Sequence, residues 1–385
     1  KILLFCGYSS RGAQCKSTGE LSMVINNKIN ETIGVSVTKP LYESYLQAKN
    51  EKKASYARDL ATYLNVSEAE LTHARVGHDA KRLHGDVRDI LTALATVGEV
   101  KAITRNEIAV HEHLGEYTNA RFNDHAGLIL NPRALDLRFF FSHWASIFAL
   151  TEETARGIRH SIQFFDLHGD SLHKVYTTDN THMDAWNTLI DTYLSPENPV
   201  LEITPAKSFT DAPVTTALAQ QLEQQWRSMT DVHQFFKILQ ENNLSRQQAF
   251  KAVSDDLAYQ VDNSALKTLL ALAKEVQNEI MIFVGNRGCV QIFTGKIDRL
   301  VPHQFENSEQ VWINIFNPAF TLHLIESEIV ESWITRKPTQ DGFVTSLELF
   351  DSKGQQIAQL YGQRTEGTKE QQQWREQLNA LAKIA

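Results

Sequence analysis

The stretch LILNPRALDLRFFF at residues 128–141 has a counterpart much later in the chain, INIFNPAFTLHLIE at residues 313–326. A second pair follows in the same order, SIQFFDLHGDSLHKVYTT (161–178) and SLELFDSKGQQIAQLYGQ (346–363). Almost the same number of residues separates the two members of each pair. This spacing indicates a duplicated domain, because solenoid repeats have units of about 20–50 residues. Two related domains share an interface, and such interfaces are favoured places for a small-molecule pocket.

A third pair is NEIAVHEHLG (106–115) and NEIMIFVGNRG, which begins at residue 278. Fewer residues separate its two members than separate the members of the other pairs. This difference predicts an insertion in the second copy, between the segment that begins at residue 278 and the segment that begins at residue 313. In this alignment His111 is the counterpart of Phe283, so one copy has a potential ligand where the other has an aromatic ring for stacking or core packing. His111 and His113 lie on one strand face, but two histidines make an incomplete metal site.

Length and composition predict a globular protein of two domains. The chain has 385 residues, of which 42% are hydrophobic and 22% are charged. We expect an extension of uncertain structure at residues 1–36 and two repeats, at residues 37–205 and 206–385, joined within 205–217.

The charge, the cysteines and the apolar stretches restrict the classes of protein to which the chain belongs. Three scattered cysteines form no disulfide framework and favour a reducing cytoplasm. A net charge of −8 disfavours nucleic acid as a partner. Every apolar stretch is far shorter than the roughly 20 residues of a membrane-spanning helix, so we expect no membrane-embedded segment. Motifs of Rossmann folds, P-loop NTPases, c-type cytochromes and the commonest zinc hydrolases are absent from the sequence.

Within each repeat, segments of helical spacing precede alternating or apolar runs. This order predicts an α+β fold with antiparallel sheets. Helices are predicted at 41–62, 67–75, 85–97, 133–149, 151–158, 214–229, 231–242, 245–258 and 263–275. Strands are predicted at 100–104, 107–113, 126–131, 160–166, 279–284, 289–294, 311–316, 342–350 and 356–363.

Turn and capping residues support these predictions. GNRG at 285–288 is a hairpin signal, and Gly169 and Gly354 supply permissive backbone to matching turns. Ser67 and Glu70 fit a capping box. The segment ARDLATYLNVSEAEL (57–71) has the helix and turn spacing of a DNA-binding helix–turn–helix. Its second helix is acidic and would repel DNA phosphates, so a structural helical hairpin is the favoured interpretation.

The segment MTDVHQFFKILQEN contains a candidate metal ligand, His233. Val232, Phe235, Phe236 and Leu239 have the spacing of a core-facing stripe, and His233 lies at its edge. In the first helical turn the helix dipole favours a neutral imidazole, which suits an axial ligand to haem iron beside an apolar pocket. Taken alone, this local pattern is more typical of a boundary histidine hydrogen-bonded to backbone.

Several cations lie in or beside apolar elements, namely Arg138, Arg246, Lys337 and Arg364. On the strand before Arg364, the two-residue period places Gln359, Tyr361 and Gln363 on one face. A tyrosine near an arginine and a lysine suits carboxylates such as haem propionates. Solvated surface charge is the alternative for each cation.

Taken together, these segments resemble the cytoplasmic haemin-utilisation proteins of Gram-negative bacteria, the HemS/HmuS/ChuS type. The resemblance covers residues 37–385 almost without interruption. Its most specific stretches are NPRALDLR, WRSMTDVHQFF, NEIMIFVGNRGCVQIFTG, NIFNPAFTLHL, ESWITRKPT, VTSLELF and QIAQLYGQRTEG. It implies a tandem duplication in which each half has a large antiparallel β-sheet flanked by helices, with a haem cleft between the halves.

The resemblance also implies a role for each candidate residue. His233 corresponds to the iron ligand, and Arg138 to the residue that reaches the other haem face and serves catalysis. The propionate side corresponds to Arg246, Lys337, Gln359, Tyr361 and Arg364. Phe140 and Phe283 correspond to residues that pack on the macrocycle or gate the cavity. The sequence departs from the family pattern in residues 1–36 and in a longer loop around 303–311.

The implied function is haem binding in the cytoplasm for iron acquisition, with haem as ligand or substrate and an external electron donor for its degradation. The alternative is a non-catalytic haem carrier or storage protein. An inner-membrane haem importer is the implied partner. The sequence leaves open a homodimer, and it also leaves open the choice between oxygenase-like and reductive ring cleavage.

Overall fold

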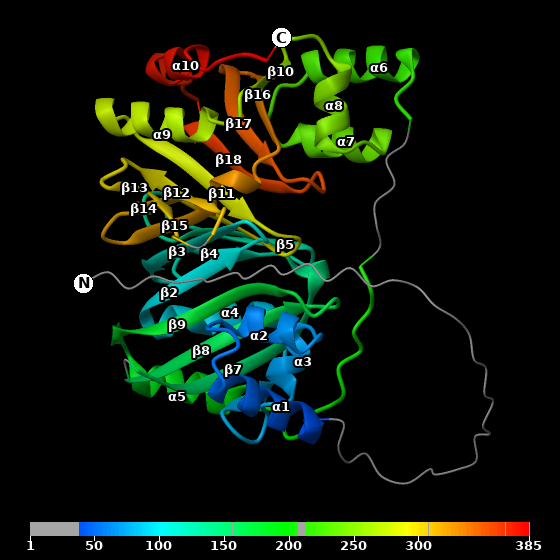
Figure 1. Cartoon of the computed structure of the whole chain (residues 1–385). Helices are drawn as coiled ribbons and strands as arrows, with labels where there is room; N and C mark the ends of the chain where they lie inside the picture. Colours follow the sequence, from blue (N-terminus) through cyan, green and yellow to red (C-terminus); the bar gives the residue numbers. More distant parts are fainter. Residues whose placement is uncertain (1–37, 156, 207–212, 307, 366, 385) are drawn as a thin grey trace, which may run out of the picture.

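A computed structural model describes residues 38–384 apart from positions 156, 207–212, 307 and 366 (Figure 1). The predicted extension at residues 1–36 and part of the predicted connection at 205–217 lie outside the described residues. Within the described part of the chain, no helix has the length and apolar character needed to cross a membrane.

In the first half, helices precede most strands, as predicted. Its elements are α1 (Thr38–Asn50), α2 (Ala57–Tyr63), α3 (Glu68–His73), β1 (Ala80–Leu83), α4 (Val87–Ala93), β2 (Gly98–Arg105), β3 (Ala109–Gly115), β4 (Ala120–Phe122), β5 (Ala126–Leu130), β6 (Asp136–Phe140), β7 (Trp144–Thr154), β8 (Gly157–Asp166), β9 (Ser171–Thr181) and α5 (Met183–Thr192).

The second half repeats this order of elements. It consists of α6 (Thr216–Arg227), α7 (Gln234–Asn242), α8 (Arg246–Ala252), β10 (Ala258–Val261), α9 (Ala265–Val276), β11 (Ile280–Gly285), β12 (Cys289–Gly295), β13 (Leu300–Gln304), β14 (Val311–Phe316), β15 (Phe320–Ile325), β16 (Glu331–Thr339), β17 (Gly342–Phe350), β18 (Gln356–Gly362) and α10 (Gln372–Asn379).

Two nine-stranded antiparallel sheets have the same strand order. Sheet A runs β1-β7-β8-β9-β2-β3-β15-β14-β13, and sheet B runs β10-β16-β17-β18-β11-β12-β6-β5-β4. Each half therefore gives three strands to the other half's sheet: β4–β6 join sheet B beside β12, and β13–β15 join sheet A beside β3. The α+β class and the antiparallel sheets are confirmed. The division of the chain at residues 205/206 stays a prediction.

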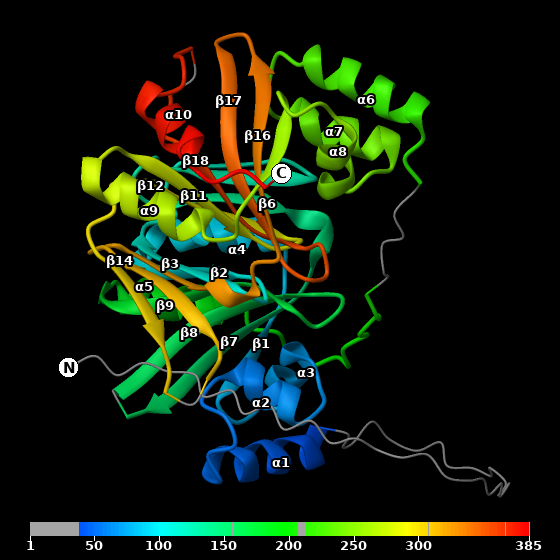
Figure 2. The same ribbon diagram turned by 45° about the horizontal axis from the view of Figure 1, so that its top comes forward.

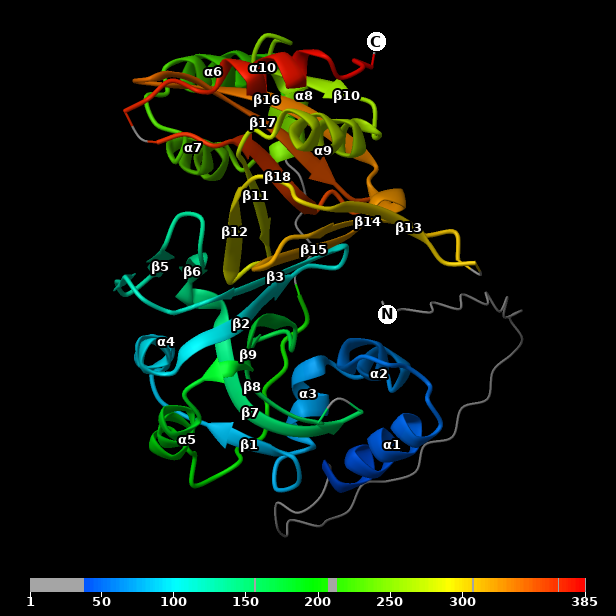
Figure 3. The same ribbon diagram turned by 90° about the vertical axis from the view of Figure 1, so that its left-hand side faces the viewer.

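Helices cover both sheets. In sheet A, α4 and α5 lie on one side and α1–α3 on the other (Figure 3). One face of sheet B packs its apolar side chains against α9 and α10, in a core that includes Ile282, Leu347 and Leu360. At one end of sheet B, α6, α7 and α8 form a group beside β16 (Figure 2). Their core includes Trp226, Phe235 and Phe250.

The register of the two central hairpins corrects the predicted third repeat. Val100 pairs with Gly115 in the β2–β3 hairpin, and Ile280 pairs with Gly295 in the β11–β12 hairpin. The segment 105–115 therefore corresponds to 285–295, not to the segment that begins at 278. Asn106 matches Asn286, His111 matches Gln291, and Phe283 matches Ile103. The alignment by sequence was wrong because both segments begin with the tripeptide NEI. In the first half this tripeptide precedes β3, whereas in the second half it leads into β11.

The predicted helices at 133–149 and 151–158 are wrong. These residues form β6, β7 and the start of β8. The aromatic and β-branched residues of this stretch suit a strand, and β7 is paired on both sides, by β1 and β8. The predicted helix at 41–62 is two helices, α1 and α2, with an interruption between residues 50 and 57.

The turn and capping predictions are confirmed. Gly169 and Gly354 have φ of +81° and +71°, conformations that favour glycine. Ser67 forms a capping box with Glu70 at the start of α3. The segment 57–71 belongs to a helical hairpin in which Leu60 and Leu71 are buried in one cluster with residues of α1.

Candidate functional site

Most of the predicted site residues lie on one face of sheet B, opposite the face that α9 and α10 cover. Gln359 pairs with Phe283 on one side and with Glu348 on the other, so these three side chains share a face. The alternation of side chains along β6, β16 and β18 adds further residues to that face. The predicted residues on this face are Arg138, Phe140, Phe283, Lys337, Gln359 and Tyr361.

His233 lies immediately before α7, at its N-cap, and not inside the first turn as predicted. Its side chain is 90% exposed. Phe236, which we expected in the core, is 62% exposed, whereas Phe235, Ile238 and Leu239 are buried. The helix begins later than predicted and is rotated so that the His233 and Phe236 positions face away from the α6–α8 core.

Asp231 holds the His233 imidazole. Its Oδ1 accepts a hydrogen bond from the His233 backbone amide at 2.8 Å and lies 2.6 Å from ring Nδ1. The bond from the backbone amide lowers the pKa of the Asp231 carboxyl, and the ring contact adds to this effect. A carboxylate on Nδ1 directs the proton to that nitrogen and leaves Nε2 as a free lone pair, the arrangement of metal-binding histidines.

Glu348 is the buried centre of a polar cluster on the same face of the sheet. Its carboxylate accepts hydrogen bonds from Lys337 Nζ at 2.7 Å and from Arg246 Nη1 at 3.0 Å, and it has no exposed side-chain surface. Burial alone would raise the pKa of Glu348, but Lys337 and Arg246 outweigh it and lower that pKa to about 2. Burial lowers the pKa of Lys337, and the Glu348 carboxylate acts against this effect.

Phe235 joins the cluster to α7. Lys337 Nζ lies 4.8 Å from the centre of the Phe235 ring, and the Arg246 guanidinium carbon lies 5.5 Å from it. Both cations therefore rest on one buried aromatic ring. Arg246 opens α8 directly after Ser245, whose capping box with Gln248 fixes the start of that helix.

Gln359 connects Arg246 to the aromatic part of the face. With its amide oxygen facing Arg246, that oxygen accepts from both terminal guanidinium nitrogens at 3.3 Å, and the amide nitrogen donates to the Tyr361 hydroxyl at 3.3 Å. The Tyr361 ring contacts the Phe283 ring edge to face, with 5.1 Å between the ring centres. Burial, with a smaller effect of Glu348, raises the pKa of Tyr361. The structure thus brings five predicted residues into one cluster, Arg246, Lys337, Gln359, Tyr361 and Phe283.

Arg138 and Phe140 lie on β6, two strands from Phe283. Arg138 pairs with Asp136 on its own strand and also donates to the Leu137 carbonyl at 3.0 Å. Its side chain is 32% exposed. Burial raises the pKa of Asp136, although Arg138 acts in the opposite direction. Phe140 is exposed and its backbone amide donates to Gly288 O at 2.9 Å. Because β6 belongs to the first half, Arg138 is a first-half residue in the sheet of the second half.

Arg364 lies outside the Glu348 cluster. It pairs with Asp341 at 3.5 Å and donates to the Thr368 carbonyl at 3.3 Å. The residue before Asp341, Gln340, donates its backbone amide to the Thr230 carbonyl at 3.0 Å, so Arg364 lies near the segment that precedes α7. Its charge contributes to the lowered pKa of Asp231.

His111 and His113 form no metal centre. His111 is completely buried, and neither ring nitrogen has a hydrogen-bond partner. Burial holds the pKa of His111 well below its usual value. His113 bonds to the Leu114 carbonyl at 2.7 Å. In the part of the chain that the structure describes, no three histidine, cysteine or acidic side chains are grouped to hold a metal ion.

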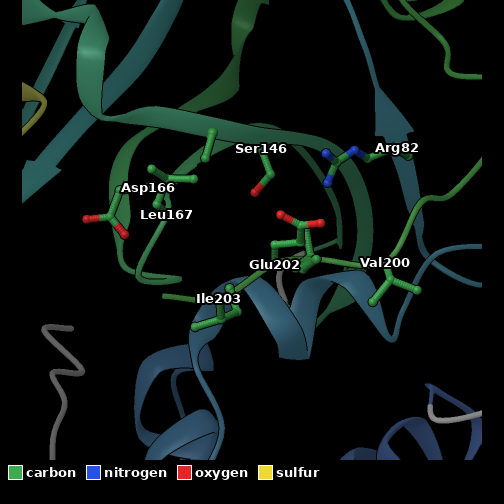
Figure 4. A pocket seen from close by; sticks show the side chains of 9 residues that line it. Arg82, Ser146, Asp166, Leu167, Val200, Glu202 and Ile203 are labelled. Carbon is green, nitrogen blue, oxygen red and sulfur yellow. The ribbon is translucent and has the colours of Figure 1, made fainter. Parts of the chain in front are cut away.

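Two cavities lie away from this face. One of about 200 Å³ lies between sheet A and the segment after α5, and Figure 4 shows Glu202 pointing toward Ser146 and Arg82 within it. The other, of about 130 Å³, is lined by residues that include Lys101, His113 and Pro318. Neither is lined by His233 or Arg138, so the cleft implied by the family resemblance does not coincide with either cavity.

Sequence reasoning missed Asp231 and Glu348. Glu348 has a recognisable signal, since it is a carboxylate within the apolar strand VTSLELF. A buried acid in such a strand requires a cation, but the sequence does not show that Lys337 and Arg246 supply it. Asp231 precedes His233 by two residues and carries the pattern of a local side-chain turn.

Comparisons with known proteins agree with the fold. The family model of the haemin-degrading HemS.ChuX domain matches residues 65–193 and again residues 243–381. The hemin transport protein HmuS of Yersinia pestis is 64% identical over 341 residues, which are 89% of this chain and 97% of that protein.

Two solved structures are similar over almost their whole length. The heme degrading enzyme ChuS of Escherichia coli O157:H7 has 56% identity and a TM-score of 0.84, covering 90% of this chain and 99% of that one. The heme-binding protein PhuS of Pseudomonas aeruginosa, in its holo form, has 36% identity and a TM-score of 0.84, covering 91% and 100%.

Proposed function

The chain belongs to the haemin-degrading HemS/ChuX family, and from this premise we propose that it binds haem for iron acquisition and degrades it to release the iron. The observation that carries the proposal is the single face of sheet B, with its cation cluster and aromatic rings, on which α7 packs through Phe235 and carries the exposed imidazole of His233 at its start. Haem requires these three features, because it has two carboxylates, a flat apolar macrocycle and an iron with axial positions.

In this proposal His233 is the axial ligand. The imidazole Nδ1 is held by Asp231, so Nε2 is the nitrogen offered to iron. Phe236 lies one helical turn further along α7 and is exposed with His233, so bound haem has an apolar side chain to cover beside the ligand.

The propionates are assigned to the polar end of the face. Arg246, Lys337, Gln359, Tyr361 and Arg364 supply donors there, and charge-assisted bonds from guanidinium groups are the strongest available to a carboxylate. Phe283 and Phe140 supply apolar contacts to the macrocycle. Phe283 already packs edge to face on Tyr361, which fixes the orientation of its ring.

Arg138 is assigned to the opposite haem face. Its guanidinium stays charged at any working pH and can donate hydrogen bonds to a bound water or oxygen ligand. In its present arrangement Arg138 is paired with Asp136. The chemistry of ring opening belongs to haem itself, with electrons from an external donor, while the protein supplies orientation and polarity.

The alternative function is a non-catalytic haem carrier or storage protein. The similar proteins include a hemin transport protein, a heme-binding protein and a heme degrading enzyme, so both functions have support. The two are separated by incubating the haem-loaded chain with a reductant and catalase, in air and without oxygen. Degradation predicts loss of the Soret band in one of the two conditions. Persistence of the Soret band in both conditions would establish the carrier.

The cellular setting follows from this proposal. We place the chain in the cytoplasm, as a pair of tandem repeats at residues 37–205 and 206–385, receiving haem from an inner-membrane importer. Co-purification of the chain with the importer from detergent extracts tests the partner. A homodimer is tested by sedimentation with and without haem, and a single monomeric species in both conditions would argue against it.

A further inference from the structure

The carboxylate of Glu348 is saturated by neighbours within the protein. Its Oε1 accepts from Lys337 Nζ, and also from Thr335 and Ser346 hydroxyls at 3.2 and 3.1 Å. Its Oε2 accepts from Arg246 and from the Gln356 amide at 3.0 and 2.8 Å. A buried carboxylate with this many donors is ionised and held in one place.

Lys337 and Arg246 differ in their freedom to meet a ligand. Lys337 is 3% exposed and its ammonium bonds to Thr335 at 2.6 Å and to Glu348 at 2.7 Å, with the Phe235 ring beside it. An ammonium has three donors, so Lys337 is nearly saturated. Arg246 is 28% exposed; it donates to Glu348 through Nη1 and to the Gln359 amide oxygen through Nη1 and Nη2, which uses three of its N–H groups. A guanidinium has five N–H groups, so Arg246 keeps donors for another carboxylate.

The duplicated fold supplies an internal control. Glu348 pairs with Trp333 and Gln359 in sheet B, and the equivalent residue of sheet A is Gln163, which pairs with Phe148 and Lys174. Lys337, opposite Val344, matches Glu152, opposite Arg159. Sheet A therefore forms the same strand pairing with a neutral residue at the central position, so the buried carboxylate is not a requirement of the sheet.

We infer that Glu348 and Lys337 are positioning residues for Arg246, and that Arg246, not Lys337, makes the direct bond to the ligand carboxylate. This inference rests on the proposed haem function and refines it. The cluster has two cations and one anion, so it presents one net positive charge to the face. That charge matches one propionate, and the Glu348 carboxylate fixes the Arg246 guanidinium that carries it.

The test replaces the buried pair with neutral side chains of similar size. The double variant Lys337→Met/Glu348→Gln removes one positive and one negative charge, so the net charge of the cluster is unchanged and only the support of Arg246 is lost. We expect haem affinity to fall about tenfold, the value of one charge-assisted hydrogen bond. Affinity for haem dimethyl ester, which lacks the propionate charges, should remain as in the unmodified chain. Equal losses for both ligands would overturn the inference.

A cycle with Arg246→Ala separates direct contact from positioning. If the pair acts only through Arg246, adding Lys337→Met/Glu348→Gln to Arg246→Ala causes no further loss of haem affinity. A further loss that is selective for haem over its dimethyl ester would show that Lys337 contacts the carboxylate itself. The matched control is Lys101→Met/Glu112→Gln, which removes an ion pair of 3.1 Å from sheet A and should leave haem affinity unchanged.

A measurement without haem keeps this inference distinct from the proposed function. In the haem-free chain labelled with ¹⁵N-arginine, we expect the Arg246 Nε–H resonance to show restricted motion, and to become mobile in Lys337→Met/Glu348→Gln. Unchanged Arg246 motion in a variant with the unmodified melting temperature would overturn the positioning role. Failure of the unmodified chain to bind haem would instead refute the proposed function.

Discussion

Asn106 and Asn286 make the same set of hydrogen bonds from opposite halves of the chain. Asn106 Nδ2 donates to the carbonyls of Gly285 and Ile357 at 3.1 and 2.8 Å, and Asn286 Nδ2 donates to those of Arg105 and Leu172 at 2.9 and 2.8 Å. Each Oδ1 accepts two backbone amides of its own hairpin turn. Each side chain therefore closes one central hairpin and fastens it to the other sheet.

Asn106→Ala and Asn286→Ala should destabilise the protein to a similar extent, each by about 2 kcal/mol or more, because each removes donors from two carbonyls of the opposite half. The measurement is the free energy of unfolding from denaturant titration. Asn187→Ala, at an exposed position of α5, is the control and should change stability little. A large cost at only one of the two asparagines would contradict their equivalence.

His233→Ala should weaken haem binding and shift the Soret maximum, because it removes the imidazole offered to iron. Absorption titration with haem measures both effects, and His84→Ala, a change at an exposed histidine on the first half, is the control. An unchanged spectrum would require another ligand. His111, the alternative from sequence, is completely buried without a hydrogen-bond partner and would need the sheets to open.

Asp231→Asn and Asp231→Ala should have graded effects on the haem site. Asparagine keeps an acceptor for Nδ1–H but loses the negative charge, so binding should persist with a higher reduction potential of the bound iron. Alanine removes the acceptor and should weaken haem binding by about tenfold or more. Spectroelectrochemistry and haem titration are the measurements. Identical behaviour of both variants and the unmodified chain would show that Asp231 does not orient His233.

Arg138→Ala should affect haem turnover more than haem binding. The guanidinium is assigned to a ligand on iron and not to the propionates, so its loss leaves most contacts of the macrocycle intact. Haem titration and single-turnover loss of the Soret band give the two quantities, with Arg138→Lys testing whether charge alone suffices. Equal losses of binding and turnover would contradict the assignment.

His173 should make the fold sensitive to acid. Its ring is buried between the Thr104 hydroxyl at 2.8 Å and the Tyr117 hydroxyl at 2.5 Å. Burial lowers the pKa of His173 to about 3. A base with a depressed pKa takes up a proton first in the unfolded chain, so its stability contribution is full above the unfolded pKa of about 6.5 and declines toward pH 3.

In this range one such histidine makes the free energy of unfolding fall by up to about 1.4 kcal/mol per pH unit. His173→Gln should reduce the slope by that amount near pH 5, whatever it does to stability at neutral pH. Denaturant titrations at several pH values measure the slope. His73, His111, His113 and His323 also have lowered pKa values through burial, so a residual slope is expected. An unchanged slope would contradict the assignment to His173.

Features that depend on neighbours along the chain, or on comparison of its two halves, could be predicted from the sequence. The duplication, the α+β order of elements, the glycine turns at Gly169 and Gly354, and the capping box of Ser67 are of this kind. Each is set by local backbone preferences or by repeated side-chain patterns. The residues of the candidate face were named from family resemblance, and strand alternation then accounts for why Gln359 and Tyr361 share a side.

The sequence did not predict how strands from the two halves combine or which charged side chains meet; these features were visible only in the folded chain. The transfer of β6 into sheet B, which carries Arg138 to the second half, is a pairing between segments far apart in sequence. The same holds for the match of Asn106 with Asn286 and for the burial of Glu348 between Lys337 and Arg246. Hydrogen-bond register and burial depend on which strands become neighbours, and one chain's residue pattern does not specify that choice.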